Sequence, residues 1–96
     1  MTGFYVFKIY DKCKKEKFYA KLKVDTKHEN NEVLLEIKDL NLYIFNTTKE
    51  KALSQIEKHL NYLYNHYAAK DIVYVFKFGK KLKQKYLNLY INKENK

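Results

Sequence analysis

The chain has 96 residues, which is enough for a single domain over residues 1–96 and leaves no room for a second domain or a deep catalytic cleft. Its 20 basic residues are all lysine and outnumber 11 acidic residues, so the net charge of +9 favours a polyanion or an acidic protein surface as partner. Cys13 is the single cysteine, which excludes an internal disulfide and indicates a reducing, cytoplasmic compartment. No apolar run approaches the roughly 18 residues that a membrane span needs.

Two segments near the N-terminus have the pattern of paired strands. Phe4–Tyr10 is rich in aromatic and β-branched residues, and apolar side chains occupy every second position of Phe18–Val24. Strict alternation of this kind is typical of a strand with one buried face. We therefore expect a hairpin whose loop lies near Asp11–Glu16.

The next segment predicts a loop and further strands. Residues Thr26–Asn31 are polar and predict a loop. Glu32–Lys38 predicts a third strand because its apolar residues alternate with polar ones. Leu40–Phe45 is apolar on both faces, which is compatible with a fourth strand or with a bulged extension of the third.

A long helix is the clearest element of the sequence. Thr47 followed by Glu50 has the spacing of a capping box, in which two free backbone donors are satisfied reciprocally. Apolar residues then recur at intervals of three and four, which places them on one stripe: Leu53, Ile56, Leu60, Leu63 and Tyr67. The pattern predicts a helix from Thr48 to about Ala68, roughly 30 Å long.

The C-terminal third is harder to assign. Ile72–Phe78 predicts a strand that is apolar on both faces, and Gly79–Lys81 predicts a turn. Residues 84–92 fit both a helix and a strand; we prefer a strand, because a helix would place lysines at the positive end of its dipole. The expected fold is α+β: a mostly antiparallel sheet of five or six strands with one long helix, about residues 48–68, on one face. The uncovered apolar face of the Ile72–Phe78 strand predicts a homodimer.

The outer face of the predicted hairpin is the main candidate site. If Ile9 lies opposite Phe18, the outward pairs are Lys8 with Tyr19, Val6 with Lys21 and Phe4 with Lys23. Lysines that alternate with aromatic rings can neutralise phosphates and stack on bases. The alternative interpretation is an ordinary solvated strand face. The lack of arginine disfavours base-specific reading of DNA.

A second basic cluster follows the predicted strand Ile72–Phe78. Its lysines are Lys77, Lys80, Lys81, Lys83 and Lys85. They are compatible with a phosphate-binding loop or with a sheet edge protected by lysine against aggregation. We expect Lys80, Lys81 and Lys83 to contact nucleic acid together with the hairpin residues Lys8, Tyr19, Lys21 and Lys23.

One short pattern resembles an enzyme motif. Asp25, followed by Glu36 and Lys38 at the end of an apolar run, resembles the PD-(D/E)xK nucleases. The resemblance implies that Asp25 and Glu36 bind a divalent metal and that Lys38 assists the attacking water. It covers about 14 residues, and it departs from the family because Val24 replaces the proline and the upstream acidic helix is missing.

The sequence as a whole favours a non-catalytic binding protein. We expect no catalytic residue, metal ligand or cofactor, since the three histidines do not have metal-site spacing. The first hypothesis is low-specificity binding of nucleic acid. The second is binding to a host protein, by analogy with the small inhibitors, anti-CRISPR-like proteins among them, that A/T-rich phages and mobile elements encode. The third is the nuclease.

Overall fold

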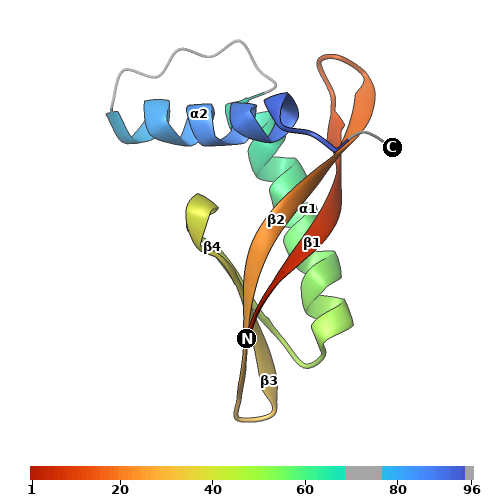
Figure 1. Cartoon of the computed structure of the whole chain (residues 1–96), viewed down its shortest axis with the longest axis vertical. Helices are drawn as coiled ribbons and strands as arrows, with labels where there is room; N and C mark the ends of the chain where they lie inside the picture. Colours follow the sequence, from red (N-terminus) through yellow and green to blue (C-terminus); the bar gives the residue numbers. More distant parts are fainter. Residues whose placement is uncertain (69–76, 95–96) are drawn as a thin grey trace.

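The computed structural model describes residues 1–68 and 77–94 and has an α+β fold (Figure 1). A four-stranded antiparallel sheet has the order β1-β2-β3-β4. Its strands are β1 (Thr2–Asp11), β2 (Glu16–Glu29), β3 (Glu32–Ile37) and β4 (Leu42–Asn46). The helices are α1 (Lys49–Tyr67) and α2 (Lys77–Ile91). The expected class is confirmed, but the described part of the chain has four strands, not five or six.

Strand β2 is the longest strand and pairs with both of its neighbours, as β3 also does. Its first ten residues pair with β1, and its last five pair with β3. The predicted register of the first hairpin is confirmed, with Ile9 opposite Phe18 and Phe7 opposite Ala20. All four of these side chains are buried in the core.

The predicted loop Thr26–Asn31 is wrong, since β2 continues to Glu29. Thr26 is buried, and pairing with β3 extends the strand through polar residues that local pattern alone assigns to a loop. Only Asn30 and Asn31 form the turn, and both have positive φ angles, 47° and 64°. Asparagine tolerates this conformation, which is typical of two-residue hairpin turns.

A short 3-10 turn, η1 (Lys38–Leu40), separates β3 from β4. Asn41 follows it with a left-handed φ of 54°, and its N–H donates to the carbonyl of Lys38. The chain reverses here, so Leu42–Asn46 is a true fourth strand and not a bulged extension of the third. Leu40 is buried in the core, which anchors the turn beneath the sheet.

Helix α1 begins one residue later than predicted. Thr48 is the N-cap, and its hydroxyl accepts from the N–H of Lys51. The predicted capping box from Thr47 to Glu50 is therefore wrong. The third helical residue is Lys51, whose ammonium cannot accept a hydrogen bond from the backbone N–H of Thr48 as a glutamate side chain would. The helix buries Ala52, Ile56, Leu60 and Tyr64 against the sheet, while Leu53, Leu63 and Tyr67 pack at the margin of the core.

Polar side chains of α1 bind the free edge of β1. Glu57, Asn61 and Asn65 are spaced by four residues and therefore lie on one face of the helix. Their oxygens accept from the backbone N–H groups of Lys8, Tyr10 and Lys12. The amides of Asn61 and Asn65 also donate to the carbonyls of Lys8 and Tyr10. Side chains of the helix thus take the place of a further strand beside β1.

The C-terminal segment is a helix, so the predicted strand at Tyr86–Ile91 and the turn at Gly79–Lys81 are wrong. Tyr86 and Leu89 are buried, and the ring of Tyr86 stacks on that of Tyr67 with centroids 5.7 Å apart. Burying such side chains contributes about 1.5–3 kcal/mol each. Lysines at the helix start cost about 0.3–1 kcal/mol each, so burial decides the structure. Residues 72–76 of the predicted strand lie outside the described residues, and the homodimer that it suggested stays a prediction.

Candidate nucleic-acid interface

The hairpin of β1 and β2 carries the predicted basic surface. Lys8 pairs with Tyr19, Val6 with Lys21 and Phe4 with Lys23, as predicted. We call this surface the lysine–aromatic face and define it as the outward side chains of residues 4–10 and 17–23: Phe4, Val6, Lys8, Tyr10, Lys17, Tyr19, Lys21 and Lys23. Its four lysines are exposed. The structure therefore brings together all of the sheet residues that the sequence singled out.

The most exposed rings of the lysine–aromatic face do not include that of Tyr19, which the sequence predicted as the stacking surface. Tyr19 is half-buried, and its carbonyl accepts from the N–H of Glu94 across 2.7 Å. Phe4 and Tyr10 are 65% and 46% exposed. The ammonium of Lys21 lies 5.6 Å from the centre of the Phe4 ring. Phe4 and Tyr10 are thus the better stacking surfaces, and their position on the outward period of β1 was the signal that could have found them.

The described part of the protein neutralises little of the charge of this face. Within residues 1–68 and 77–94, none of Lys8, Lys17, Lys21 and Lys23 forms an ion pair. The face as defined contains no carboxylate; the next outward side chain of β2 is Asp25, which is ion-paired with Lys38 and whose pKa Lys23 also lowers. Glu57 reaches its edge from α1, but that side chain accepts from the backbone N–H of Lys8. The lysines are therefore available to an external anion.

The second basic cluster lies on α2 and not in a loop. Lys80 and Lys81 are exposed in its first turns, and Lys83 is half-buried. These three predicted residues are not on the lysine–aromatic face. Lys85, one turn further on, lines a cavity that also includes Lys21 of β2. The fold thus brings one lysine of each basic cluster, Lys21 and Lys85, to the lining of the same cavity.

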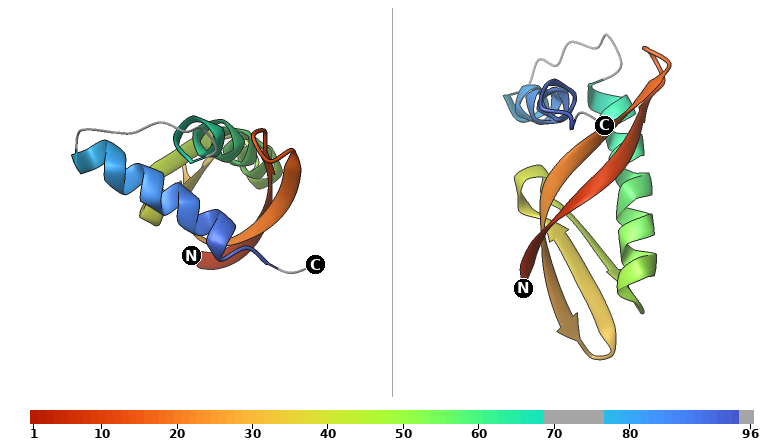
Figure 2. Two further views of the ribbon diagram at one scale, coloured as in Figure 1. Left: turned by 90° about the horizontal axis from the view of Figure 1, so that it is seen from above. Right: turned by 45° about the vertical axis from the view of Figure 1, so that its right-hand side comes forward.

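This cavity has a volume of about 330 Å³ and lies between β2, η1 and α2. Figure 2 shows the C-terminal end of α2 reaching the hairpin of β1 and β2. The lining residues are Ala20, Lys21, Leu22, Asp39, Leu40, Lys85, Asn88, Leu89 and Asn92. Sequence reasoning missed Asp39, Asn88 and Asn92, because only the tertiary fold brings η1 and α2 to β2.

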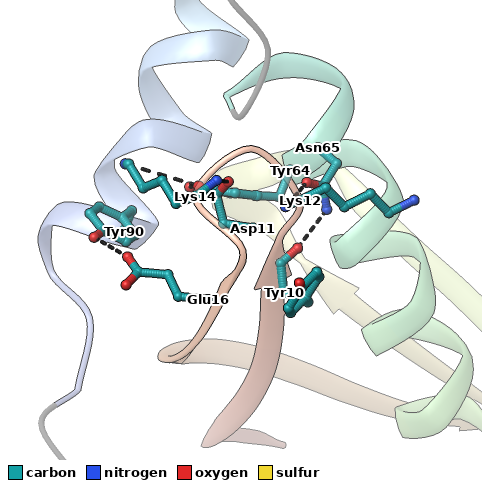
Figure 3. Close-up of polar contacts among 8 residues, drawn as sticks. All are labelled: Tyr10, Asp11, Lys12, Lys14, Glu16, Tyr64, Asn65 and Tyr90. Atoms are coloured by element: carbon teal, nitrogen blue, oxygen red, sulfur yellow. Dashed lines mark hydrogen bonds and ion pairs between the residues drawn. The ribbon is translucent and has the colours of Figure 1, made fainter.

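A polar cluster fixes the tip of the hairpin (Figure 3). Asp11 is 1% exposed, and its carboxylate accepts from the Tyr64 hydroxyl at 2.7 Å and from the N–H of Lys14 at 2.9 Å. Burial and the bond to Asp11 raise the pKa of Tyr64. The hydroxyl of Tyr90 donates to Glu16, which raises the pKa of Tyr90. These contacts tie β1 and β2 to both helices.

The ring of Tyr90 also binds two ammonium groups. Lys14 lies 3.6 Å from the ring centre and Lys93 lies 4.0 Å from it. Cation–π contacts of this kind hold the lysines in place while leaving their charge intact. Cys13 is exposed in the same tip.

The residues of the nuclease-like pattern lie close together. Asp25 pairs with Glu36 across β2 and β3, and the ammonium of Lys38 lies 3.1 Å from the Asp25 carboxylate. The hydroxyl of Thr2 donates to the other oxygen of Asp25, and with Lys38 it lowers the pKa of Asp25. The same ion pair raises the pKa of Lys38. Lys38 belongs to η1, not to the strand on which the sequence placed it.

The described residues contain no cluster of three or more histidine, cysteine, aspartate or glutamate side chains near enough to share a metal ion. Within the same ranges, neither helix has both the length and the apolar composition that a membrane crossing requires. Comparisons with protein-family models, with curated proteins and with solved structures find no match to this chain.

Proposed function

We propose that this protein binds nucleic acid, with little sequence preference, through the lysine–aromatic face. The observation that carries the proposal is the composition of that face: four exposed lysines without ion pairs to the described residues, two exposed rings, and no carboxylate. Lysines neutralise phosphates and release counterions, which provides affinity without selecting a base.

Single strands are the favoured form of nucleic acid. The rings of Phe4 and Tyr10 stand out from the sheet, where unpaired bases can stack on them. In a duplex the bases are already stacked on one another and cannot reach a flat protein surface. The chain has no arginine for the bidentate contacts to guanine that are commonest in specific reading of the major groove.

Titration of fluorescent 15-nucleotide single strands and of matching duplexes at several salt concentrations tests the proposal. Replacing Lys21 and Lys23 by alanine should reduce the magnitude of the log–log salt slope by about 1.4–1.8, or 0.7–0.9 per lost contact. Phe4→Ala or Tyr10→Ala should weaken binding to single strands by about 1–3 kcal/mol. Tyr19→Ala should cost less, because Tyr19 is half-buried.

The matched control is the double variant Lys51→Ala and Lys58→Ala, which removes the same charge from exposed positions of α1. It should leave the salt slope nearly unchanged. The proposal fails if the chain binds no oligonucleotide at about 150 mM salt more tightly than the 10⁻⁴ to 10⁻⁶ M of non-specific contacts.

A protein partner is the second candidate, and one observation favours it. Tyr43 and Phe45 lie side by side on β4, are 61% and 50% exposed, and pack edge to face with ring centres 6.4 Å apart. Exposed aromatic residues are enriched at protein interfaces. Tight one-to-one binding to a host enzyme, together with negligible affinity for nucleic acid, would select this function. Tyr43→Ala should then weaken the complex, while the pair Lys21→Ala and Lys23→Ala should not.

A further inference from the structure

We propose that the cavity between β2, η1 and α2 receives one unstacked base of the bound strand, and that it selects bases with an exocyclic amino group. This inference rests on the proposed binding of nucleic acid and adds a specificity that the lysine–aromatic face does not have. Lys21 belongs to both surfaces, so a strand bound on the face passes the cavity.

The cavity exists because β2 loses its neighbour partway along its edge. The register with β3 ends at Asp25, where the chain turns away into η1. Further along the same edge, the carbonyl of Tyr19 accepts from Glu94. Successive residues of a strand alternate in direction, so the backbone of Lys21 and Lys23 has the same orientation as that of Tyr19. Between Tyr19 and Asp25, the backbone N–H and carbonyl groups of Lys21 and Lys23 therefore face the cavity side of β2, where they need partners.

The lining has the chemistry of a base-binding site. Leu22, Leu40 and Leu89 supply apolar surface for the faces of a flat ring. Asn88 and Asn92 supply amides that can both donate and accept at a ring edge. The volume of about 330 Å³ lies at the lower end of the range for small-molecule sites, which is large enough for one base.

Asp39 determines which part of a nucleotide enters. Its carboxylate forms no hydrogen bond or ion pair with the described residues, and it lines the cavity together with Lys21 and Lys85. A carboxylate repels phosphate and, when ionised, only accepts hydrogen bonds. Asp39 therefore excludes the sugar–phosphate backbone of the strand from the interior of the cavity and binds the amino group of cytosine, adenine or guanine. Thymine and uracil have no amino group, and their one ring N–H lies between two carbonyl oxygens that the carboxylate repels.

The test compares (dT)15 with the same strand carrying one central dC, so that length and charge are equal. We expect the dC strand to bind at least about tenfold more tightly, which is the lower limit of the contribution of one hydrogen bond to a charged group. Asp39→Asn should reduce this ratio to within about twofold and leave the salt slope unchanged. Glu29→Gln, the same charge change at the tip of the second hairpin, is the control and should keep the ratio.

A second variant tests the cavity without changing its charge. Asn88→Trp, made at an exposed position of α2, should fill the opening and abolish the preference for dC while binding to (dT)15 persists. Equal affinity of the wild-type protein for both strands overturns the inference and leaves the proposed function intact. An equal loss of preference in Asp39→Asn and Glu29→Gln also overturns it. If neither strand binds, the proposed function itself fails.

Discussion

The side-chain amide of Asn61 donates to the backbone carbonyl of Lys8 across 2.9 Å, and its oxygen accepts from the N–H of Tyr10 at 2.7 Å. An amide group has the donor and acceptor of a peptide bond, so it can complete the hydrogen bonds of a strand edge. The spacing also matches, because four helical residues rise about 6.0 Å and two strand residues about 6.7 Å. Helix α1 thereby blocks this edge against pairing with another chain.

The first prediction concerns Asn65, which is 8% exposed. Asn65→Ala removes the partners of the Tyr10 carbonyl and of the Lys12 N–H. Two partly buried backbone groups are then left unsatisfied, so the free energy of unfolding should fall by about 2–4 kcal/mol. Denaturation in urea measures the change.

Ser54→Ala, at an exposed position of the same helix, is the control and should change stability by less than about 0.5 kcal/mol. Asn65→Asp keeps the acceptor for the Lys12 N–H but turns a carboxylate oxygen toward the carbonyls of Tyr10 and Asn61, so it should also be less stable than the wild type. A cost of Asn65→Ala no greater than that of Ser54→Ala would contradict the role of the edge contacts.

The second prediction concerns the buried pair at the hairpin tip. Tyr64→Phe keeps the ring but removes the hydroxyl that donates to the Asp11 carboxylate. Hydrogen bonds to charged groups contribute about 1.5–3 kcal/mol, and we expect the free energy of unfolding to fall by that amount. Tyr62→Phe, the same change at a residue that is 70% exposed on the same helix, should be nearly neutral. Equal effects of the two variants would refute the importance of the Asp11 contact.

The third prediction is a loss of stability at high pH. Burial raises the pKa of Tyr86 to about 12, from 10.0 in water. The folded protein keeps this proton while the unfolded chain releases it, so the stabilisation is complete below pH 10 and declines as the pH rises toward 12. By pH 11, the difference in unfolding free energy between wild type and Tyr86→Phe should have fallen by roughly 1 kcal/mol from its neutral value.

Denaturation of the wild type and of Tyr86→Phe at pH 8 and pH 11 measures this change. Lysine deprotonation affects both proteins alike and cancels in the comparison. Tyr43→Phe, at a ring that is 61% exposed, serves as the reference substitution. The prediction is wrong if both substitutions change the pH dependence to the same extent.

The fourth prediction is that the protein does not cleave single- or double-stranded DNA or RNA with magnesium or manganese. The carboxylate of Asp25 is held by Thr2 and by the Lys38 ammonium, and within the described residues Asp25 and Glu36 belong to no group of three histidine, cysteine, aspartate or glutamate side chains that could share a metal ion. Incubation of labelled substrates with purified protein and either metal tests this. Cleavage that disappears in both Glu36→Ala and Lys38→Ala would instead support the nuclease hypothesis.

The sequence by itself determined the elements whose burial follows a local period. The alternation of Phe7 and Ile9 against Phe18 and Ala20 is sufficient to predict the first hairpin and its register, and hence the outward positions of Lys8, Lys21 and Lys23. The apolar stripe of α1 is equally local. In both cases neighbouring residues in the sequence share one face, so no distant contact is needed to assign it.

Only the tertiary structure decided the C-terminal helix, the length of β2 and the cavity. Leu89 fits both periods, and its burial together with Tyr86 against α1 and η1 selects the helix. Thr26 is polar, and pairing with β3 makes it part of a strand. Asp39 and Asn88 become neighbours of Lys21 through contacts between segments far apart in the chain. Such contacts leave no local pattern, because their energy comes from surfaces that meet only after folding.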